Sequence, residues 1–304
     1  MNNEESRSGG NTEGKPLAGD VWADVLSSQK EEINGYHIYR RLSESAKDQR
    51  IKEILSQIAD DELKHYNFWK NYTQVEVKPS KLRVWFYFLI SRLLGITFGL
   101  KLMENGEVRT QLVYDRLSKF IPGVKDILRE EENHEDQLID SIKEDRLEYI
   151  GSIVLGLNDA LVELTGALAG FAFAFQNSRL VAVAGLITGI AASLSMAASE
   201  YLSTKAEDGG RHPAKAAIYT GVAYLLTVSL LILPFLVLQE TLISLGLAVL
   251  AAIVVIFIFT YYVSVVKNLS FPRRFAEMVT ISLGVAVLTF LIGLLVRIFL
   301  GIEI

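Results

Sequence analysis

The chain has 304 residues, of which half are hydrophobic and 21% are charged, and it contains no cysteine. The missing thiols exclude disulfides, thiolate metal sites and cysteine nucleophiles, and no basic block points to a nucleic-acid partner. Charge is split unevenly: residues 1–149 carry 22 Lys and Arg against 27 Asp and Glu, whereas residues 150–304 carry 8 of each kind. The second half therefore has the composition of a membrane domain.

Residues 1–18 form a polar, acidic start without an apolar core. This composition does not fit a secretory signal and predicts a disordered tail. The charged segment 19–147 follows, and its pattern predicts four helices near 20–45, 48–72, 81–119 and 124–147, with breaks at Pro79 and at Pro122-Gly123. Four helices with short links indicate an all-α antiparallel bundle.

Two of these helices carry the same acidic motif, Glu62-x-x-His65 and Glu131-x-x-His134. Residues three apart share a helix face, so each pair can bind one cation. The remaining two helices offer further carboxylates: Glu32, Glu104 and Glu107. Two Glu-x-x-His pairs plus a Glu from each other helix are typical of di-metal bundles. The alternative is that these glutamates lie on solvated, Glu-rich helix faces. We assign Glu130 to such a face, and it is the nearest competitor of Glu131 for the role of metal ligand.

This segment resembles the rubrerythrin-type ferritin-like proteins, on the two Glu-x-x-His motifs, the Glu104-x-x-Glu107 pair and Glu32 followed by Tyr39. The resemblance implies that Glu32, Glu62, His65, Glu104, Glu107, Glu131 and His134 bind a di-iron centre. It also implies oxidation of ferrous iron by oxygen or peroxide. The absence of cysteine removes the electron-relaying iron centre of full-length rubrerythrins, so peroxidase turnover would need an external donor.

Residues 84–100 are strongly apolar for a soluble helix, although Arg92 interrupts them. We interpret them as the start of the long third helix. Their apolar face either forms plain bundle core or packs on a partner or on the bilayer surface.

Five apolar stretches make up residues 148–304, and each is long enough to cross a bilayer as a helix. They lie near 150–175, 180–203, 214–238, 241–266 and 277–300. The links between the second and third and between the fourth and fifth stretches hold the basic residues Lys205, Arg211, Lys215, Lys267, Arg273 and Arg274. The positive-inside rule then predicts a cytoplasmic N-terminal domain and an outside C-terminus, in the cell or inner membrane.

Charged residues inside a spanning segment are costly and therefore indicate function. Asp159 and Glu163 lie four apart in the first stretch, as do Met196 and Glu200 in the second. Carboxylates with a thioether favour a softer divalent ion such as ferrous iron, and carboxylates can also exchange protons. The alternatives are a solvated Glu200 at the interface and a Met196 that only packs.

This half resembles the vacuolar iron transporter family, in the segments GLNDALVELTGALAG and SMAASEYLSTKAED. The resemblance implies a five-helix homodimer that moves ferrous iron, sometimes manganese, out of the cytosol against protons, with Asp159, Glu163, Met196 and Glu200 on the pathway. Relatives carry a helical metal-binding insert between the second and third helices, which the short link 204–213 lacks.

Together the halves look like membrane-bound ferritins, which fuse a rubrerythrin-like domain to such a transporter. Our hypothesis is a di-iron bundle that captures, senses or oxidises the ion beside a proton-driven carrier in the lipid bilayer. The rival hypothesis is a membrane-tethered ferroxidase or peroxidase whose spanning helices serve mainly as an anchor. Iron and manganese are both compatible with the ligands.

Overall fold

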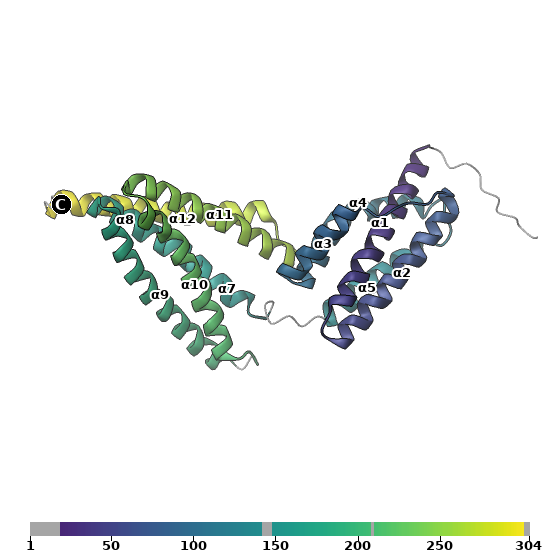
Figure 1. The fold of residues 1–304 in the computed structure, drawn as a ribbon, viewed down its shortest axis with the longest axis horizontal. Helices are drawn as coiled ribbons and strands as arrows, with labels where there is room; N and C mark the ends of the chain where they lie inside the picture. Colours follow the sequence, from purple (N-terminus) through teal and green to yellow (C-terminus); the bar gives the residue numbers. More distant parts are fainter. Residues whose placement is uncertain (1–18, 142–147, 208–209, 301–304) are drawn as a thin grey trace, which may run out of the picture. The chain divides into compact units, whose positions relative to one another are not determined.

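The structure, a computed structural model, describes residues 19–141, 148–207 and 210–300, leaving out the side chains of residues 19, 20, 104–112, 132, 135–141 and 300. All regular elements in the described part of the chain are helices (Figure 1). The chain divides into two compact units, Met1–Ile142 and Lys143–Ile304.

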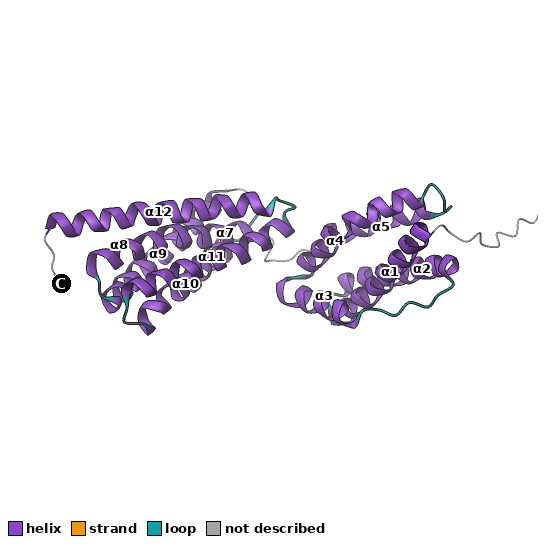
Figure 2. Ribbon diagram, turned by 90° about the horizontal axis from the view of Figure 1, so that it is seen from above, coloured by secondary structure: helices purple, strands orange, loops and turns teal. Residues whose placement is uncertain are grey.

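Five helices are described in the N-terminal unit: α1 Gly19–Ser45, α2 Gln49–Thr73, α3 Lys81–Leu94, α4 Ile96–Leu117 and α5 Val124–Ser141. Helix α2 begins where the Asp48 carboxylate accepts hydrogen bonds from the N–H groups of Arg50 and Ile51. It ends at Gln74 in the left-handed conformation, whose N–H bonds to the carbonyl of Lys70. Helix α1 packs along α2, and α5 packs on both α2 and α4 (Figure 2).

The third predicted helix, 81–119, is wrong as a single element, because the structure divides it into α3 and α4 at Gly95. Gly95 has φ 108°, a conformation that side-chain-bearing residues rarely adopt. The chain turns there so closely that a Cβ atom on Gly99 would lie 1.8 Å from the Oγ of Ser91. The unit is therefore not a plain four-helix bundle.

Two apolar clusters lie at different levels along the helices of this unit. One consists of Ile38, Leu42, Leu55, Ile58, Val84, Leu100 and Met103. The other consists of Val25, Trp69, Tyr114, Leu117, Ile121, Val124 and Ile127. On α2, Glu62 and His65 fall between the residues of the first cluster and Trp69 of the second. The sequence thus places the acidic motif in the interior, between two apolar layers.

The second unit contains five helical segments long and apolar enough to cross a membrane. The first is a continuous run of α7 Ile150–Asp159, the π-helix η1 Ala160–Leu164 and α8 Thr165–Phe175. The others are α9 Ser178–Ala206, α10 Pro213–Val237, α11 Thr241–Val266 and α12 Phe271–Leu300. The prediction of five helices long and apolar enough to span a membrane is confirmed, with α12 starting six residues earlier than expected.

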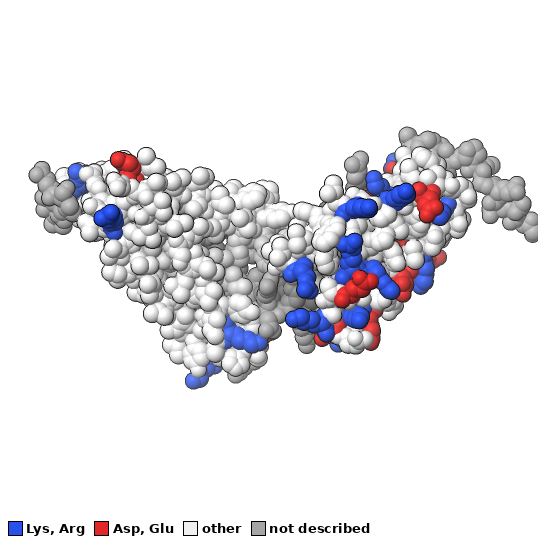
Figure 3. All heavy atoms as spheres, viewed as in Figure 1, with Lys and Arg blue, Asp and Glu red and all other residues white. Residues whose placement is uncertain are grey.

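Small residues let these helices approach closely. A Cβ atom on Gly189 of α9 would lie 2.6 Å from a methyl group of Val228 on α10, and one on Gly156 would lie 2.4 Å from the carbonyl oxygen of Thr220. Large apolar side chains such as Leu226, Val237 and Ile258 point outward, as lipid-facing residues do. Figure 3 shows few charged side chains on this unit, in contrast to the N-terminal unit.

Candidate functional site

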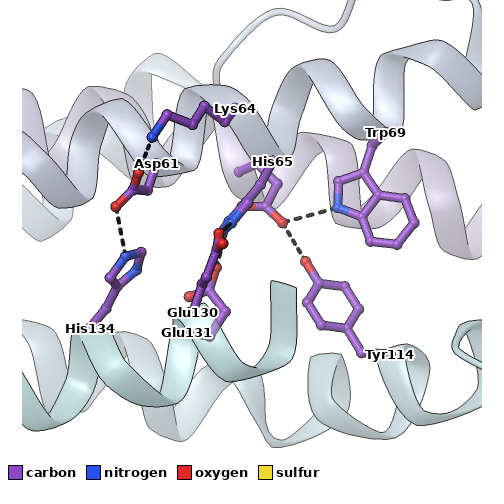
Figure 4. A network of polar contacts seen from close by, with 9 residues as sticks. Asp61, Lys64, His65, Trp69, Tyr114, Glu130, Glu131 and His134 are labelled. Carbon is purple, nitrogen blue, oxygen red and sulfur yellow. Dashed lines mark hydrogen bonds and ion pairs between the residues drawn. The ribbon is translucent and has the colours of Figure 1, made fainter. Parts of the chain in front are cut away.

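The two Glu-x-x-His motifs of the N-terminal unit meet in its interior. His65 of α2 faces Glu131 and His134 of α5 (Figure 4). Helix α1 adds Glu32. Two groups of possible ligands result, Glu32 with His65 and Glu131, and Glu62 with Glu131 and His134. Within each group one ligand atom per residue lies within 4.8 Å of the others. Glu131 belongs to both groups, so it can bridge two neighbouring metal ions.

His65 turns its Nδ1 toward these carboxylates. The Nδ1 of His65 lies 2.9 Å from Oε1 of Glu131 and 3.6 Å from Oε2 of Glu32. The Nδ1 atoms of His65 and His134 are both buried, and neither makes a well-aligned hydrogen bond with the described residues. Buried polar atoms normally have partners. A cation bound by these carboxylates and imidazoles would give such a nitrogen a partner.

The opposite ring nitrogens are held by a second pair of acids. The Nε2 of His65 lies 2.8 Å from Oε2 of Glu130, and the Nε2 of His134 lies 3.0 Å from Oδ2 of Asp61. Each acid directly precedes the motif Glu on the facing helix, so the two pairs cross between α2 and α5. A carboxylate on Nε2 fixes the tautomer that leaves Nδ1 for a metal ion.

Sequence reasoning missed Asp61 and assigned Glu130 to the surface. Glu130 is indeed exposed, but it also contacts His65. The signal was present in the sequence, since an acidic residue precedes both motif glutamates. Which histidine each acid contacts could not be predicted from the sequence, because the histidine lies on the other helix.

Glu32 is fixed by two aromatic donors. The indole N–H of Trp69 donates to Oε1 of Glu32 at 3.0 Å, and the hydroxyl of Tyr114 donates to the same oxygen in a short hydrogen bond. The other oxygen of Glu32, Oε2, faces the Nδ1 of His65. These donors were also missed, although Trp69 lies four residues after His65 and thus on the same face of α2.

Glycine makes room for the second carboxylate. A Cβ atom on Gly35 of α1 would lie 2.6 Å from Oε2 of Glu62. Any side chain at position 35 would therefore displace the Glu62 carboxylate. This close approach explains why helix α1 has a residue of low helix propensity at its centre.

The charges of this cluster are mutually adjusted. Burial lowers the pKa of His65, but the carboxylates of Glu131 and Glu32 outweigh it and raise the pKa to about 11. Burial raises the pKa of Glu32, yet hydrogen bonding to His65 and its charge bring it below the usual value. His65 is therefore protonated at neutral pH in the metal-free protein, and a metal ion must displace that proton.

Two predicted ligands, Glu104 and Glu107, lie on α4, but their side chains fall outside the described residues. The structure brings together Glu32, Glu62, His65, Glu131 and His134. These acidic and histidine clusters could bind a metal ion, and the identity of the ion and the full ligand set stay predictions.

In the membrane unit, Asp159 and Glu163 mark the change from α-helix to π-helix. Asp159 ends α7 and Glu163 lies within η1. The wider turn alters the hydrogen-bond ladder, and the carbonyl of Leu161 accepts a hydrogen bond from Ser282 of α12 at 2.8 Å. The hydroxyl of Tyr224 on α10 donates to Oε2 of Glu163 at 3.1 Å. Single π-turns occur frequently at functional sites.

Glu200 of α9 is buried rather than solvated. Its Oε1 accepts hydrogen bonds from Ser152 of α7 at 2.5 Å and from Thr204 at 3.5 Å. The alternative of a simply hydrated side chain is therefore wrong. Met196, one turn earlier, packs against the apolar core of the unit, which is the contact that a packing role requires. Its place on a transport pathway stays a prediction.

Comparison of the chain with known proteins gives one family match. Residues 150–209 match the VIT family. The matched segment covers α7 through α9 and includes Asp159, Glu163, Met196 and Glu200. The chain matches no curated protein and no solved structure.

The VIT family match and the five apolar helices together support a vacuolar iron transporter-like membrane domain. They suggest transport of a metal ion across a membrane. The match ends at residue 209, so α10 to α12 and the whole N-terminal unit are interpreted from their own structure.

Proposed function

We propose that this chain is a carrier that moves ferrous iron, or manganese, out of the cytosol in exchange for protons. Its N-terminal unit would be a cytoplasmic, ferritin-like di-iron bundle of the rubrerythrin type that captures, senses or oxidises the ion. The observation that carries the proposal is the presence of Asp159, Glu163 and Glu200 on spanning helices, within the segment that matches the VIT family.

The depth of these acids supports a transport role. At 1.5 Å per residue, Asp159 lies about 14 Å and Glu163 about 20 Å along the first spanning helix, well inside a hydrocarbon core of about 30 Å. Ionised groups at such depth are rare unless they serve a pathway. Carboxylates that alternately hold a divalent cation and a proton provide the exchange that proton coupling requires.

Glu163 is exposed on the single chain. A carboxylate facing lipid would be costly, so this surface must meet water or protein. We propose that a second copy of the chain covers it, giving a homodimer with the pathway near the shared face. The symmetric dimer is the commonest form of oligomer.

Basic residues support the orientation. Lys205 lies in the last turn of α9 and Arg211 in the link to α10. Lys267 follows α11, and Arg273 and Arg274 lie in the first turn of α12. The positive-inside rule places these links in the cytoplasm. With five spans, the N-terminal unit is then cytoplasmic and the C-terminus is outside.

The acid and histidine clusters support a metal-holding role for the N-terminal unit. The buried Nδ1 atoms, the shared Glu131 and the Glu62 carboxylate that Gly35 admits fit a divalent cation. A bound ion would be held by Glu32, His65, Glu131, Glu62 and His134, with Glu104 and Glu107 as further ligands by resemblance. This arrangement lets the unit take up ferrous ions from the cytosol.

Transport is tested with the full chain in liposomes that contain a ferrous-ion indicator and a pH indicator. We expect ferrous entry that requires a pH gradient and moves protons the opposite way. Asp159→Asn and Glu163→Gln should each abolish it, whereas Glu240→Gln, in the link before α11, should not. Ion flux that persists in both pathway variants would disprove the assignment.

A membrane-tethered ferroxidase is the second candidate function, favoured by the paired metal-ligand groups. Anaerobic addition of ferrous iron to the full chain, followed by oxygen, should give an optical change if the unit oxidises iron. A carrier that also oxidises iron keeps the optical change in Asp159→Asn while losing flux. An optical change with no flux in the wild-type chain would favour the tethered enzyme.

A further inference from the structure

Helix α3 exposes an apolar face. Leu82, Trp85, Phe86, Leu89 and Leu93, here called the α3 apolar face, have exposed fractions of 87%, 55%, 54%, 49% and 60%. Their spacing of three to four residues places them along one side of the helix. Val84 and Ser91 lie on the opposite side and are buried. An exposed, contiguous apolar patch of this kind marks an interaction surface.

Positive charge surrounds this face. Helix α3 holds Lys81, Arg83 and Arg92 and no acidic residue, although acids outnumber bases in residues 1–149 as a whole. Arg83 is paired with Glu31. Lys81 and Arg92 are exposed, and Arg92 donates a hydrogen bond to the carbonyl of Ser45 at 3.3 Å. From α1, the guanidinium of Arg41 lies 5.1 Å from the centre of the Trp85 ring. Apolar and basic residues on one helix, with a tryptophan, are typical of helices that lie in a membrane interface.

The chain also keeps a bilayer within reach. Helix α5 ends at Ser141 and the first spanning helix begins at Ile150. Even a fully extended connection of this length covers only about 30 Å. Gly95 separates α3 from α4, so the axis of α3 does not continue that of α4.

We infer that the α3 apolar face docks on an anionic phospholipid surface, with Lys81 and Arg92 over the headgroups. A second copy of the chain is the other occupant to consider. A symmetric interface places the same patch on both partners, so it would bring Lys81 and Arg92 of the two copies together. Like charges at such a contact repel, whereas anionic headgroups complement them. This inference depends on the spanning helices and not on the transported ion.

The absence of cysteine allows a direct test in the full chain. Phe86→Cys and the control Glu53→Cys, on an exposed position of α2, each receive a nitroxide spin label. The labelled chains are placed in bilayers of phosphatidylcholine and phosphatidylglycerol, and relaxation by oxygen and by a water-soluble nickel complex is measured. We expect oxygen to relax the label at position 86 more strongly than nickel does, as in lipid. At position 53 we expect stronger relaxation by nickel, as in water.

Two outcomes contradict the inference. Equal, water-like access of nickel at positions 86 and 53 means that the face is solvated. Exclusion of both reagents at position 86, with dipolar broadening between labels, means that a second copy of the chain covers it.

The headgroup contact has its own test. In the Phe86→Cys background, Lys81→Gln and Arg92→Gln should each lower the ratio of docked to undocked label about fivefold in anionic bilayers. Lys52→Gln on α2 is the matched control and should change nothing. An identical ratio in pure phosphatidylcholine and in anionic bilayers would contradict the contribution of charge.

Discussion

The two units surround their carboxylates with different partners. In the N-terminal unit, Glu131 lies beside His65, and both histidines are held by further acids from the facing helix. In the membrane unit, Glu163 and Glu200 receive hydrogen bonds from the hydroxyls of Tyr224 and Ser152. The first environment is a network of charges with fixed geometry, and the second consists of neutral hydroxyl donors.

This difference separates holding an ion from passing it on. Several charged ligands with fixed orientations bind a cation strongly and release it slowly. Carboxylates with neutral hydroxyl partners can bind a cation more weakly and release it faster, as a carrier must. We therefore expect the N-terminal cluster to depend on every member of its network, and the membrane acids to tolerate loss of a hydroxyl.

The largest effect is expected from Glu131→Ala. Glu131 is the one described residue common to both ligand groups, so its loss should weaken metal binding more than about 100-fold, beyond the range of an outer-shell residue. Anaerobic equilibrium dialysis with ferrous iron measures this. Asp126→Ala, an exposed acid on the same helix, is the control. Unchanged affinity in Glu131→Ala would show that the described cluster is not the metal site.

The acids behind the histidines should have the next largest effect. Asp61→Ala removes the partner of His134 and should weaken metal binding about 10- to 100-fold. Glu130→Ala should weaken it less, because its side chain is 54% exposed whereas that of Asp61 is 15% exposed. The neighbouring acid Asp60 serves as control through Asp60→Ala. A larger effect at Glu130 than at Asp61 would reverse our ranking.

Binding of the ion should depend on pH. The pKa of His65 is raised from 6.5 to about 11, so between pH 6 and 8 the metal must displace its proton. Affinity should therefore rise about tenfold per pH unit for that one proton. Calorimetry in buffers of different ionisation enthalpy measures the proton released. Release of no proton at pH 7 would contradict the protonated state of His65.

Stability of the metal-free protein should change in the opposite direction. A raised pKa in the folded state stabilises the fold fully below pH 6.5, and this contribution is lost as pH rises toward 11. Thermal unfolding of metal-free protein between pH 6 and 9 shows whether His65 contributes with this sign.

The smallest effect is expected in the membrane unit. Tyr224→Phe removes the hydroxyl that donates to Glu163, and loss of about one hydrogen bond should lower the transport rate about fivefold. Ser229→Ala on the same helix is the control, since its hydroxyl bonds only to the carbonyl of Leu225 among the described contacts. Complete loss of transport in Tyr224→Phe would mean that the membrane site is as strictly organised as the bundle.

Periodicity and composition were sufficient for the spanning helices. Runs of more than 20 apolar residues can satisfy their backbone in lipid only as helices, and four of the five segments both begin and end within three residues of the prediction. The shared face of each Glu-x-x-His motif was also predictable, because residues three apart lie on one side of a helix.

Other features depend on contacts between distant residues. The break at Gly95 escaped prediction because a glycine inside an apolar helical pattern is usually tolerated, and only its φ of 108° marks the turn. The π-turn at Glu163 leaves no periodic signal, since it is stabilised by side chains such as Ser282 from another helix.

The sequence by itself determined the helices other than the pair divided at Gly95, the five apolar segments and the faces on which the acids lie. These follow from local spacing and from the cost of polar groups in lipid. Only the tertiary structure decided the partners. It pairs Asp61 with His134 and Glu130 with His65. It brings Trp69 and Tyr114 within hydrogen-bonding distance of Glu32. It also buries Glu200, which accepts a hydrogen bond from Ser152. Such pairings join residues on different helices, and they are fixed by how the helices pack rather than by spacing along the chain.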